Sequence, residues 1–171
     1  MKFPPKIIHD NGVYKFDADR KIYRQDRMKR VYFVLDFSKC TVYRGHLNYH
    51  KIKVNRRSPI VCPSFVTDHN CVVRKGAFHV EPSGVRTFDI RVGGTLETSI
   101  KTFKNGKFNI NDLDIRIRPQ TSLQIYLNNP HNEPQRRVEA HLDVSKMLTY
   151  LQVIKILRVG NKSERAKRLL G

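Results

Sequence analysis

The chain has 171 residues, of which 33 are Lys or Arg and 15 are Asp or Glu, so its formal net charge is +18. This length predicts one domain with a sizeable core, and the well-spread apolar residues exclude wholesale disorder. No apolar stretch reaches the roughly 18 residues of a membrane-spanning helix, and the start, MKFPPK, lacks the apolar run of a signal peptide. We therefore expect a place inside the cell, in cytoplasm or nucleus, or in a virion, and neither secretion nor membrane insertion.

The N-terminal segment is predicted to begin extended. Residues 1–11 read as a lead-in stiffened by a Pro-Pro pair, because proline disfavours helix at and before its own position. Residues 13–16 form a candidate short strand. Residues 19–30, DRKIYRQDRMKR, are polar and predict either a short basic helix, capped by Asp17 or Asp19, or a charged loop.

From residue 30 the pattern changes to the alternation of a half-buried strand. In residues 30–37 apolar side chains recur at every second position, and residues 40–44 are the expected hairpin partner across a short connection. Residues 60–62 are apolar and stand between two prolines. They predict a short edge strand, because proline cannot donate to a sheet ladder.

Residues 85–127 carry the clearest pattern of the chain, an antiparallel meander of about four strands. The Gly-Gly at 93–94 and the Asn-Gly at 105–106 predict hairpin turns, because these residues accept the positive φ that such turns require. The last strand of the meander covers residues 123–127 and ends before Asn-Asn-Pro.

One strand of the meander has a strict two-residue period. Residues 114–118 read DIRIR. Successive side chains of a strand point to opposite faces of the sheet. We therefore expect Ile115 and Ile117 in the core and Arg116 and Arg118 in solvent. A shift of one residue in register would exchange the two sets.

Near the C-terminus the period becomes helical. We expect a helix over residues 143–158, with Asp143 as its N-cap and Gly160-Asn161 as its stop. Its apolar surface is wider than one contact requires, because Tyr150, Val153 and Ile156 add to the main stripe. We expect this surface to be buried in the monomer, and assembly of copies on a polyanion is the alternative. The main stripe consists of Val144, Met147, Leu148, Leu151 and Ile154.

Together these elements predict a β-rich α+β fold, an antiparallel β-meander forming a sandwich or barrel with a C-terminal amphipathic helix. A single domain over residues 12–160 follows the lead-in at 1–11 and precedes a short basic tail at 161–171. The three cysteines lack paired spacing, which predicts free thiols in a reducing compartment. They are Cys40, Cys62 and Cys71.

Three basic groups are candidates for binding a polyanion. The first interleaves cations with an aromatic ring, as single-stranded nucleic acid requires, although a nuclear localisation signal or a solvated connector gives the same pattern. The second is expected on a loop. The third lies on the polar face of the meander, where cations two residues apart can contact successive phosphates. The alternative is an ordinary solvated face on which Asp89 and Asp114 pair with these cations. Arg86 is an alternative to Arg91 in this group. The groups are Arg20, Lys21, Tyr23, Arg24, Arg27, Lys29 and Arg30; Lys51, Lys53, Arg56 and Arg57; and Arg91, Lys101, Arg116 and Arg118.

No metal, cofactor or catalytic site is predicted. The histidines and cysteines that could be gathered into a zinc site match no finger, ribbon or knuckle spacing, and they are His46, His50, Cys62, His69 and Cys71. The carboxylates nearest to a nuclease pattern form no recognised signature; they are Asp112 and Asp114, with Glu97 and Lys101 one strand away. The chain also lacks the P-loop, GxSxG and HExxH motifs.

The charge surplus without a catalytic motif predicts a non-enzymatic structural protein. We expect it to bind RNA, or a ribonucleoprotein, through phosphate contacts, as viral capsid or matrix proteins and components of large ribonucleoproteins do. The first alternative is a peripheral membrane protein of matrix type that binds anionic lipid and self-associates as a homo-oligomer. The second alternative is a metal-dependent nuclease.

Overall fold

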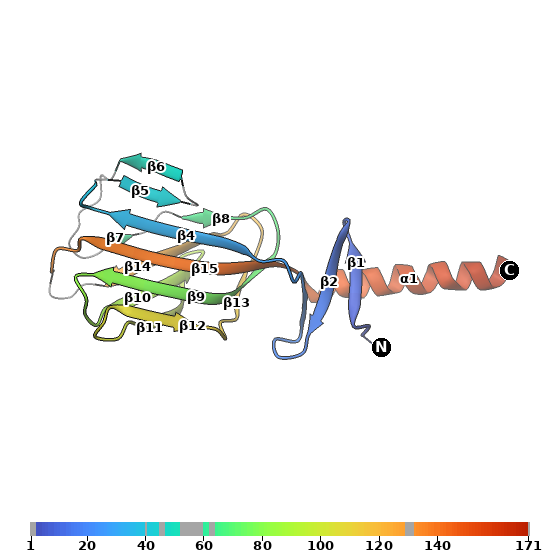
Figure 1. Cartoon of the computed structure of the whole chain (residues 1–171). Coiled ribbons are helices and arrows are strands. Elements are labelled where there is room, and N and C mark those ends of the chain that lie inside the picture. Colours follow the sequence, from blue (N-terminus) through green and yellow to red (C-terminus); the bar gives the residue numbers. More distant parts are fainter. Residues whose placement is uncertain are drawn as a thin grey trace.

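The computed structural model describes residues 3–39, 41–44, 47–51, 60–61, 64–128 and 132–170, with backbone alone at 42–44, 47–51 and 161–170. The fold is β-rich, with two antiparallel sheets and one C-terminal helix (Figure 1). The elements are β1 (Lys6–His9), β2 (Gly12–Asp17), β3 (Ile22–Arg24), β4 (Lys29–Asp36), β5 (Thr41–Arg44), β6 (Leu47–Lys51), β7 (Ile60–Val61), β8 (Phe65–Val66), β9 (Cys71–Glu81), β10 (Thr87–Val92), β11 (Thr95–Lys101), β12 (Lys107–Ile110), β13 (Ile115–Ile117), β14 (Ser122–Asn128), β15 (Arg137–Leu148) and α1 (Tyr150–Leu170).

The larger sheet is organised around β15. The body of β15 pairs with β4 on one side and β9 on the other, and its last two residues pair with β3. The strand order is β1-β2-β3-β15-β4-β5-β6, while β12 and β13 add to the far side of β9. The smaller sheet has the order β11-β10-β14-β7, with β8 also on β14. The predicted short edge strand at 60–62 is confirmed at β7, which ends this sheet.

The two sheets enclose the main core. Phe78 of β9 and Phe88 of β10 meet across the sheets with ring centroids 5.0 Å apart. The strands that the alternation predicted are present, and the predicted inward residues are buried, although Val34 and Asp36 on the opposite face of β4 are buried as well. The fully or almost fully buried predicted positions are Val31, Phe33, Leu35, Ile115, Ile117, Leu123, Ile125 and Leu127.

The connections within the sandwich differ from those of a simple meander. The turn at Gly93-Gly94 joins β10 to β11 as predicted, and both glycines have positive φ. The turn at Gly106 is also present, but β12 leaves it to pair with β9 in the other sheet. The chain therefore crosses between the sheets at this turn, then returns through β14, which pairs with β10.

The N-terminal region is more structured than the sequence predicted. Residues 6–9, expected as part of an extended lead-in, form β1 and pair with β2. Residues 19–30 are neither a helix nor simply a loop, because Ile22 and Tyr23 of β3 are buried. The apolar pair overrides the charged surroundings, since it packs on the end of β15 beside Met147 and Leu148.

The predicted helix bounds were wrong. Residues 143–148 belong to β15, and α1 begins at Tyr150 and continues through Gly160-Asn161 into the expected tail. The end of β15 is covered on both faces, and strands buried on both faces lose the alternating pattern. A capping box starts the helix: Gln152 N donates to Thr149 Oγ1, and Thr149 N donates to Gln152 Oε1.

Helix α1 packs on the small N-terminal strands. Figure 1 shows it extending away from the sandwich, with β1 and β2 beside its first half. Val153 is buried and Ile156 partly buried against a second core, as predicted. The expected burial of Tyr150 and Leu151 was wrong, because both side chains are about 70% exposed. The other members of this core are Ile7, Tyr14, Tyr23 and Leu148. Within the described residues, no helix has both the length and the apolar character needed to cross a membrane.

Candidate nucleic-acid interface

A half-enclosed groove of about 1090 Å3 lies where the β1–β3 strands and the start of α1 meet one end of the sandwich. This volume is at the upper end of small-molecule pockets, which run to roughly 1,000 Å3. Its walls are largely apolar and aromatic, with Phe16 and Tyr23 on one side and Ile117 on the other. The cations among its lining residues are Lys21, Arg116 and Arg118, and the one carboxylate is Glu97.

The cations of the groove come from two neighbouring segments. Arg116 and Arg118 flank the buried Ile117 and are exposed, as the alternation predicted. Arg116 Nε donates to Asp114 Oδ1 at 3.2 Å, and both side chains remain about half exposed. Among the described residues, Arg118 and Lys21 make no ion pair. The lining residues of the groove therefore present three cations and one exposed carboxylate, Glu97, while Asp114 pairs with Arg116 from outside the lining.

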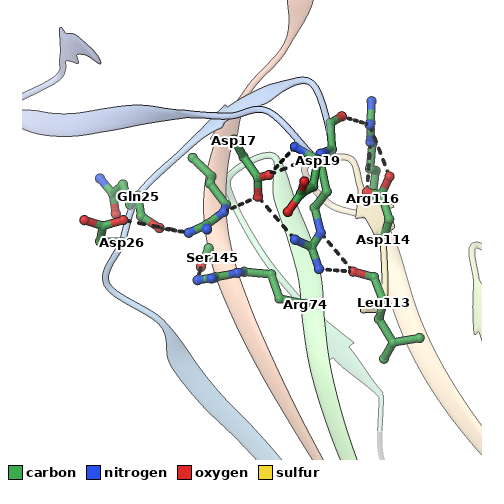
Figure 2. A network of polar contacts seen from close by, with 11 residues as sticks. Asp17, Asp19, Gln25, Asp26, Arg74, Leu113, Asp114, Arg116 and Ser145 are labelled. Carbon is green, nitrogen blue, oxygen red and sulfur yellow. Dashed lines mark hydrogen bonds and ion pairs between the residues drawn. The ribbon is translucent and has the colours of Figure 1, made fainter. Parts of the chain in front are cut away.

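A buried polar network fixes the β2–β3 hairpin, and hence one wall of the groove, on the sandwich (Figure 2). Asp17 is its centre, with a side chain only 6% exposed. Arg24 Nε donates to Asp17 Oδ2 at 2.7 Å, and Arg20 Nη1 donates to the same oxygen at 3.2 Å. Burial raises the pKa of Asp17, but the hydrogen bonds from Arg24 and Arg20 outweigh it and lower the pKa to about 2.

The same network reaches the strand that carries the groove cations. Arg20 Nη2 donates to the carbonyl oxygen of Leu113 at 2.7 Å, and Arg116 Nη2 donates to the carbonyl oxygen of Arg20 at 2.9 Å. On the other side, Arg74 Nη1 donates to Ser145 Oγ at 3.4 Å, while burial lowers the pKa of Arg74. Hydrogen bonds thus tie the hairpin to Leu113 and to Arg116 of β13, and backbone pairing of β3 joins it to the end of β15 (Figure 2).

The first predicted basic group is divided by the structure. Arg20 and Arg24 hold Asp17, and Tyr23 is 3% exposed with its hydroxyl donating to the carbonyl of Pro4, so these three are structural. Lys21 lies in the groove. Arg30 pairs with Asp143 at 3.0 Å on the outer face of the larger sheet. The remaining two, Arg27 and Lys29, line a separate hollow with Lys146.

The other predicted groups are also dispersed. Arg91 lies over the ring of Tyr126, with its Cζ 5.4 Å from the ring centroid, and Lys101 is exposed at the end of β11. Arg86, the alternative to Arg91, pairs with Glu133. The second group lies outside the described side chains; it comprises Lys51, Lys53, Arg56 and Arg57. Of all the predicted residues, the groove gathers Lys21, Arg116 and Arg118, with the buried Tyr23 in its wall.

A polar cluster on the outer face of the larger sheet was not predicted. Glu139 of β15 receives a hydrogen bond from Arg137 Nε at 2.6 Å and lies 3.5 Å from His141 Nε2 and 4.0 Å from His79 Nδ1. The His141 imidazole lowers the pKa of Glu139 to about 2, burial opposes the shift, and Arg137 adds to it. Tyr32 stacks on His141. The sequence signal for this face is the polar side chain at every second position, at residues 137, 139, 141 and 143.

The described residues contain no group of three His, Cys, Asp or Glu side chains able to hold a metal ion. Cys71 is a buried free thiol, and burial raises its pKa. Of the other zinc candidates, His69 is exposed, and the side chains of His46, His50 and Cys62 lie outside the described residues. Of the nuclease candidates, Asp114 is engaged by Arg116.

Comparisons with known proteins add little. No protein-family model and no curated protein matches the chain. Among solved structures, the chain is similar to the exo-β-1,3-galactanase Pc1,3Gal43A of Phanerochaete chrysosporium with galactose, at 11% identity and a TM-score of 0.36. The match covers 80% of this chain and 34% of that one, so the chain spans about a third of the galactanase.

Proposed function

We propose that this protein is a non-enzymatic structural protein that binds RNA, or a ribonucleoprotein, through phosphate groups held at the mouth of the groove. The observation that carries the proposal is the convergence of Lys21, Arg116 and Arg118 on one groove. Arg116 and Arg118 stand two residues apart on one strand face, so their backbones are about 7 Å apart and each can meet a separate phosphate.

The whole-chain charge supports the same proposal. A formal charge of +18 gives long-range attraction for any polyanion, and the cations of the groove can then contact its phosphates directly. Recognition of this kind positions a strand by its backbone and reads little base sequence. Capsid or matrix proteins and components of large ribonucleoproteins use nucleic acid in this way.

A salt series tests the proposal. We expect the logarithm of the affinity for an RNA oligonucleotide to fall linearly with the logarithm of the salt concentration, and Arg118→Ala to reduce that slope by about 1. Lys104→Ala is the charge-matched control, because Lys104 lies in the exposed turn at the far end of β11. Affinity that does not change with salt contradicts the proposal.

Two further assays separate the alternatives. Flotation with phosphatidylserine vesicles detects a peripheral membrane protein, whose basic face binds anionic lipid. A cleavage assay on RNA and DNA with Mg²⁺ and with EDTA detects a nuclease. The proposal predicts that RNA prevents the protein from floating with the vesicles. It also predicts that the protein cleaves neither RNA nor DNA.

A further inference from the structure

We propose that the groove binds single-stranded nucleic acid by stacking bases on its aromatic walls, in addition to holding phosphates at its mouth. This inference rests on the proposed function and extends it, because it selects single strands over duplexes. It begins from a feature that phosphate binding leaves unexplained. A phosphate contact needs cations alone, yet the walls of this groove are mainly apolar.

Three aromatic side chains from distant segments line the groove and keep much of their surface exposed. Phe3 precedes β1 and is 43% exposed, Phe16 of β2 is 42% exposed, and Tyr150 at the start of α1 is 70% exposed. Large apolar side chains that gather at a concave surface indicate a binding site. The fold supports their positions, because Phe16 packs on the buried Tyr23 with centroids 5.3 Å apart, and the Thr149–Gln152 capping box fixes the backbone beside Tyr150.

The combination of rings and cations identifies the partner. Lys21, Arg116 and Arg118 lie in the same groove as these rings. Single strands expose flat base faces next to phosphates, whereas a duplex hides the base faces in its stack. Rings that stack on bases, with cations holding the backbone beside them, are the usual means of binding single strands without reading sequence.

The test compares three probes at equal salt: a labelled 15-nucleotide oligouridylate, an RNA duplex and inorganic polyphosphate. The variants are Tyr150→Leu and Phe16→Leu, which keep an apolar side chain but remove the ring. Phe103→Leu is the matched control, because Phe103 is 64% exposed in the turn after β11 and does not line the groove. We expect the two groove variants to bind the single strand on the order of ten-fold more weakly. Their salt slope and polyphosphate affinity should not change, and Phe103→Leu should behave as the wild type.

Each contrary outcome has a distinct meaning. Equal losses for oligouridylate and polyphosphate, or no loss for either, overturn the stacking proposal while the phosphate-binding function stands. Wild-type protein that binds none of the three probes overturns the proposed function itself. Tighter binding of duplex than of single strand, or phosphatidylserine vesicles that displace the oligonucleotide and depend on Tyr150, also contradict stacking of bases. Tyr150 is mostly exposed, so its variant folds and the test remains decisive.

Discussion

Arg24 Nε lies 2.7 Å from Asp17 Oδ2, and the two residues connect β3 to β2 where the hairpin joins the end of β15 in the larger sheet. Both side chains are largely buried, at 16% and 6% exposed. Beneath them, Ile22 packs on Val72 and Met147. The wall of the groove formed by this hairpin therefore depends on one carboxylate and a small apolar contact.

Asp17→Asn should be strongly destabilising. The change leaves Arg20 and Arg24 buried near Arg74 without their anion, and breaking a buried ion pair costs about 3–5 kcal/mol. Urea unfolding measures the cost. Asp114→Asn is the control, because the Asp114–Arg116 pair is about half exposed and such pairs contribute about 1 kcal/mol or less. Similar midpoints for the two variants would show that the hairpin does not rely on this network.

Stability should also depend on the ionisation of Asp17 at low pH. Its pKa is about 2 in the folded protein against an ordinary 3.8, so the unfolded chain binds the proton more tightly. The contribution of Asp17 is therefore complete above about pH 5 and is lost as pH falls toward 2. We expect the stability difference between wild type and Asp17→Asn to narrow by about 1–2 kcal/mol between pH 6 and pH 2.5. A constant difference contradicts the assigned pKa.

The strands were predictable wherever one face is buried and the other solvated. That condition holds for β10, β13 and β14 and for the first half of β4, and their alternation appears directly in the sequence. It fails at the end of β15, where the hairpin covers the outer face, so Val144, Met147 and Leu148 were read as a helix stripe. Local pattern cannot report a covering element that comes from the other end of the chain.

The groove was only partly predictable for a related reason. Arg116 and Arg118 were identified because a strict two-residue period fixes their direction. Phe3, Phe16 and Tyr150 carry no shared local signal, since they converge only when β2 and α1 pack on the same end of the sandwich. The dense basic run around Arg20 does not form one binding surface, because Arg20 and Arg24 pair with the buried Asp17 and only Lys21 of the run's cations lines the groove.

Neighbouring side chains at β13 should affect different properties, one the free energy of unfolding and the other the affinity for RNA. Ile117 is 1% exposed, so Ile117→Ala should cost about 2–4 kcal/mol in urea unfolding. Arg118→Ala removes an exposed side chain and should cost less than about 0.5 kcal/mol, yet weaken the binding of RNA. Equal losses of stability would mean that the two side chains do not face opposite sides.

The turn that carries the chain between the sheets should not tolerate a side chain. Gly106 has a φ of 77°, and a Cβ there would lie 2.6 Å from the carbonyl oxygen of Val80. Gly94 has a φ of 83° with open space around it. Gly94→Ala is therefore a control that measures only the cost of the positive φ, about 1–2 kcal/mol of the free energy of unfolding. We expect thermal unfolding to show a larger loss for Gly106→Ala than for Gly94→Ala. Equal losses would indicate that the carbonyl of Val80 moves aside freely.

Docking of α1 should depend on one of its faces. Val153 is 4% exposed within a small core, so Val153→Ala should cost about 2 kcal/mol for the lost apolar contact. Because this core is separate from the main one, we expect the helix to detach before the sandwich unfolds, seen as early proteolysis within α1. Leu151→Ala is the control, since Leu151 is 71% exposed and should leave proteolysis unchanged.

The Leu151→Ala variant also decides whether the exposed face of α1 mediates self-association. Tyr150, Leu151 and Val159 leave an apolar surface on the helix, but copies of a chain with a charge of +18 repel one another. We therefore expect sedimentation to give the same monomer for wild type and Leu151→Ala without a polyanion. A wild-type oligomer that Leu151→Ala dissociates, with stability unchanged, would assign the exposed helix face to a contact between copies and contradict the monomer.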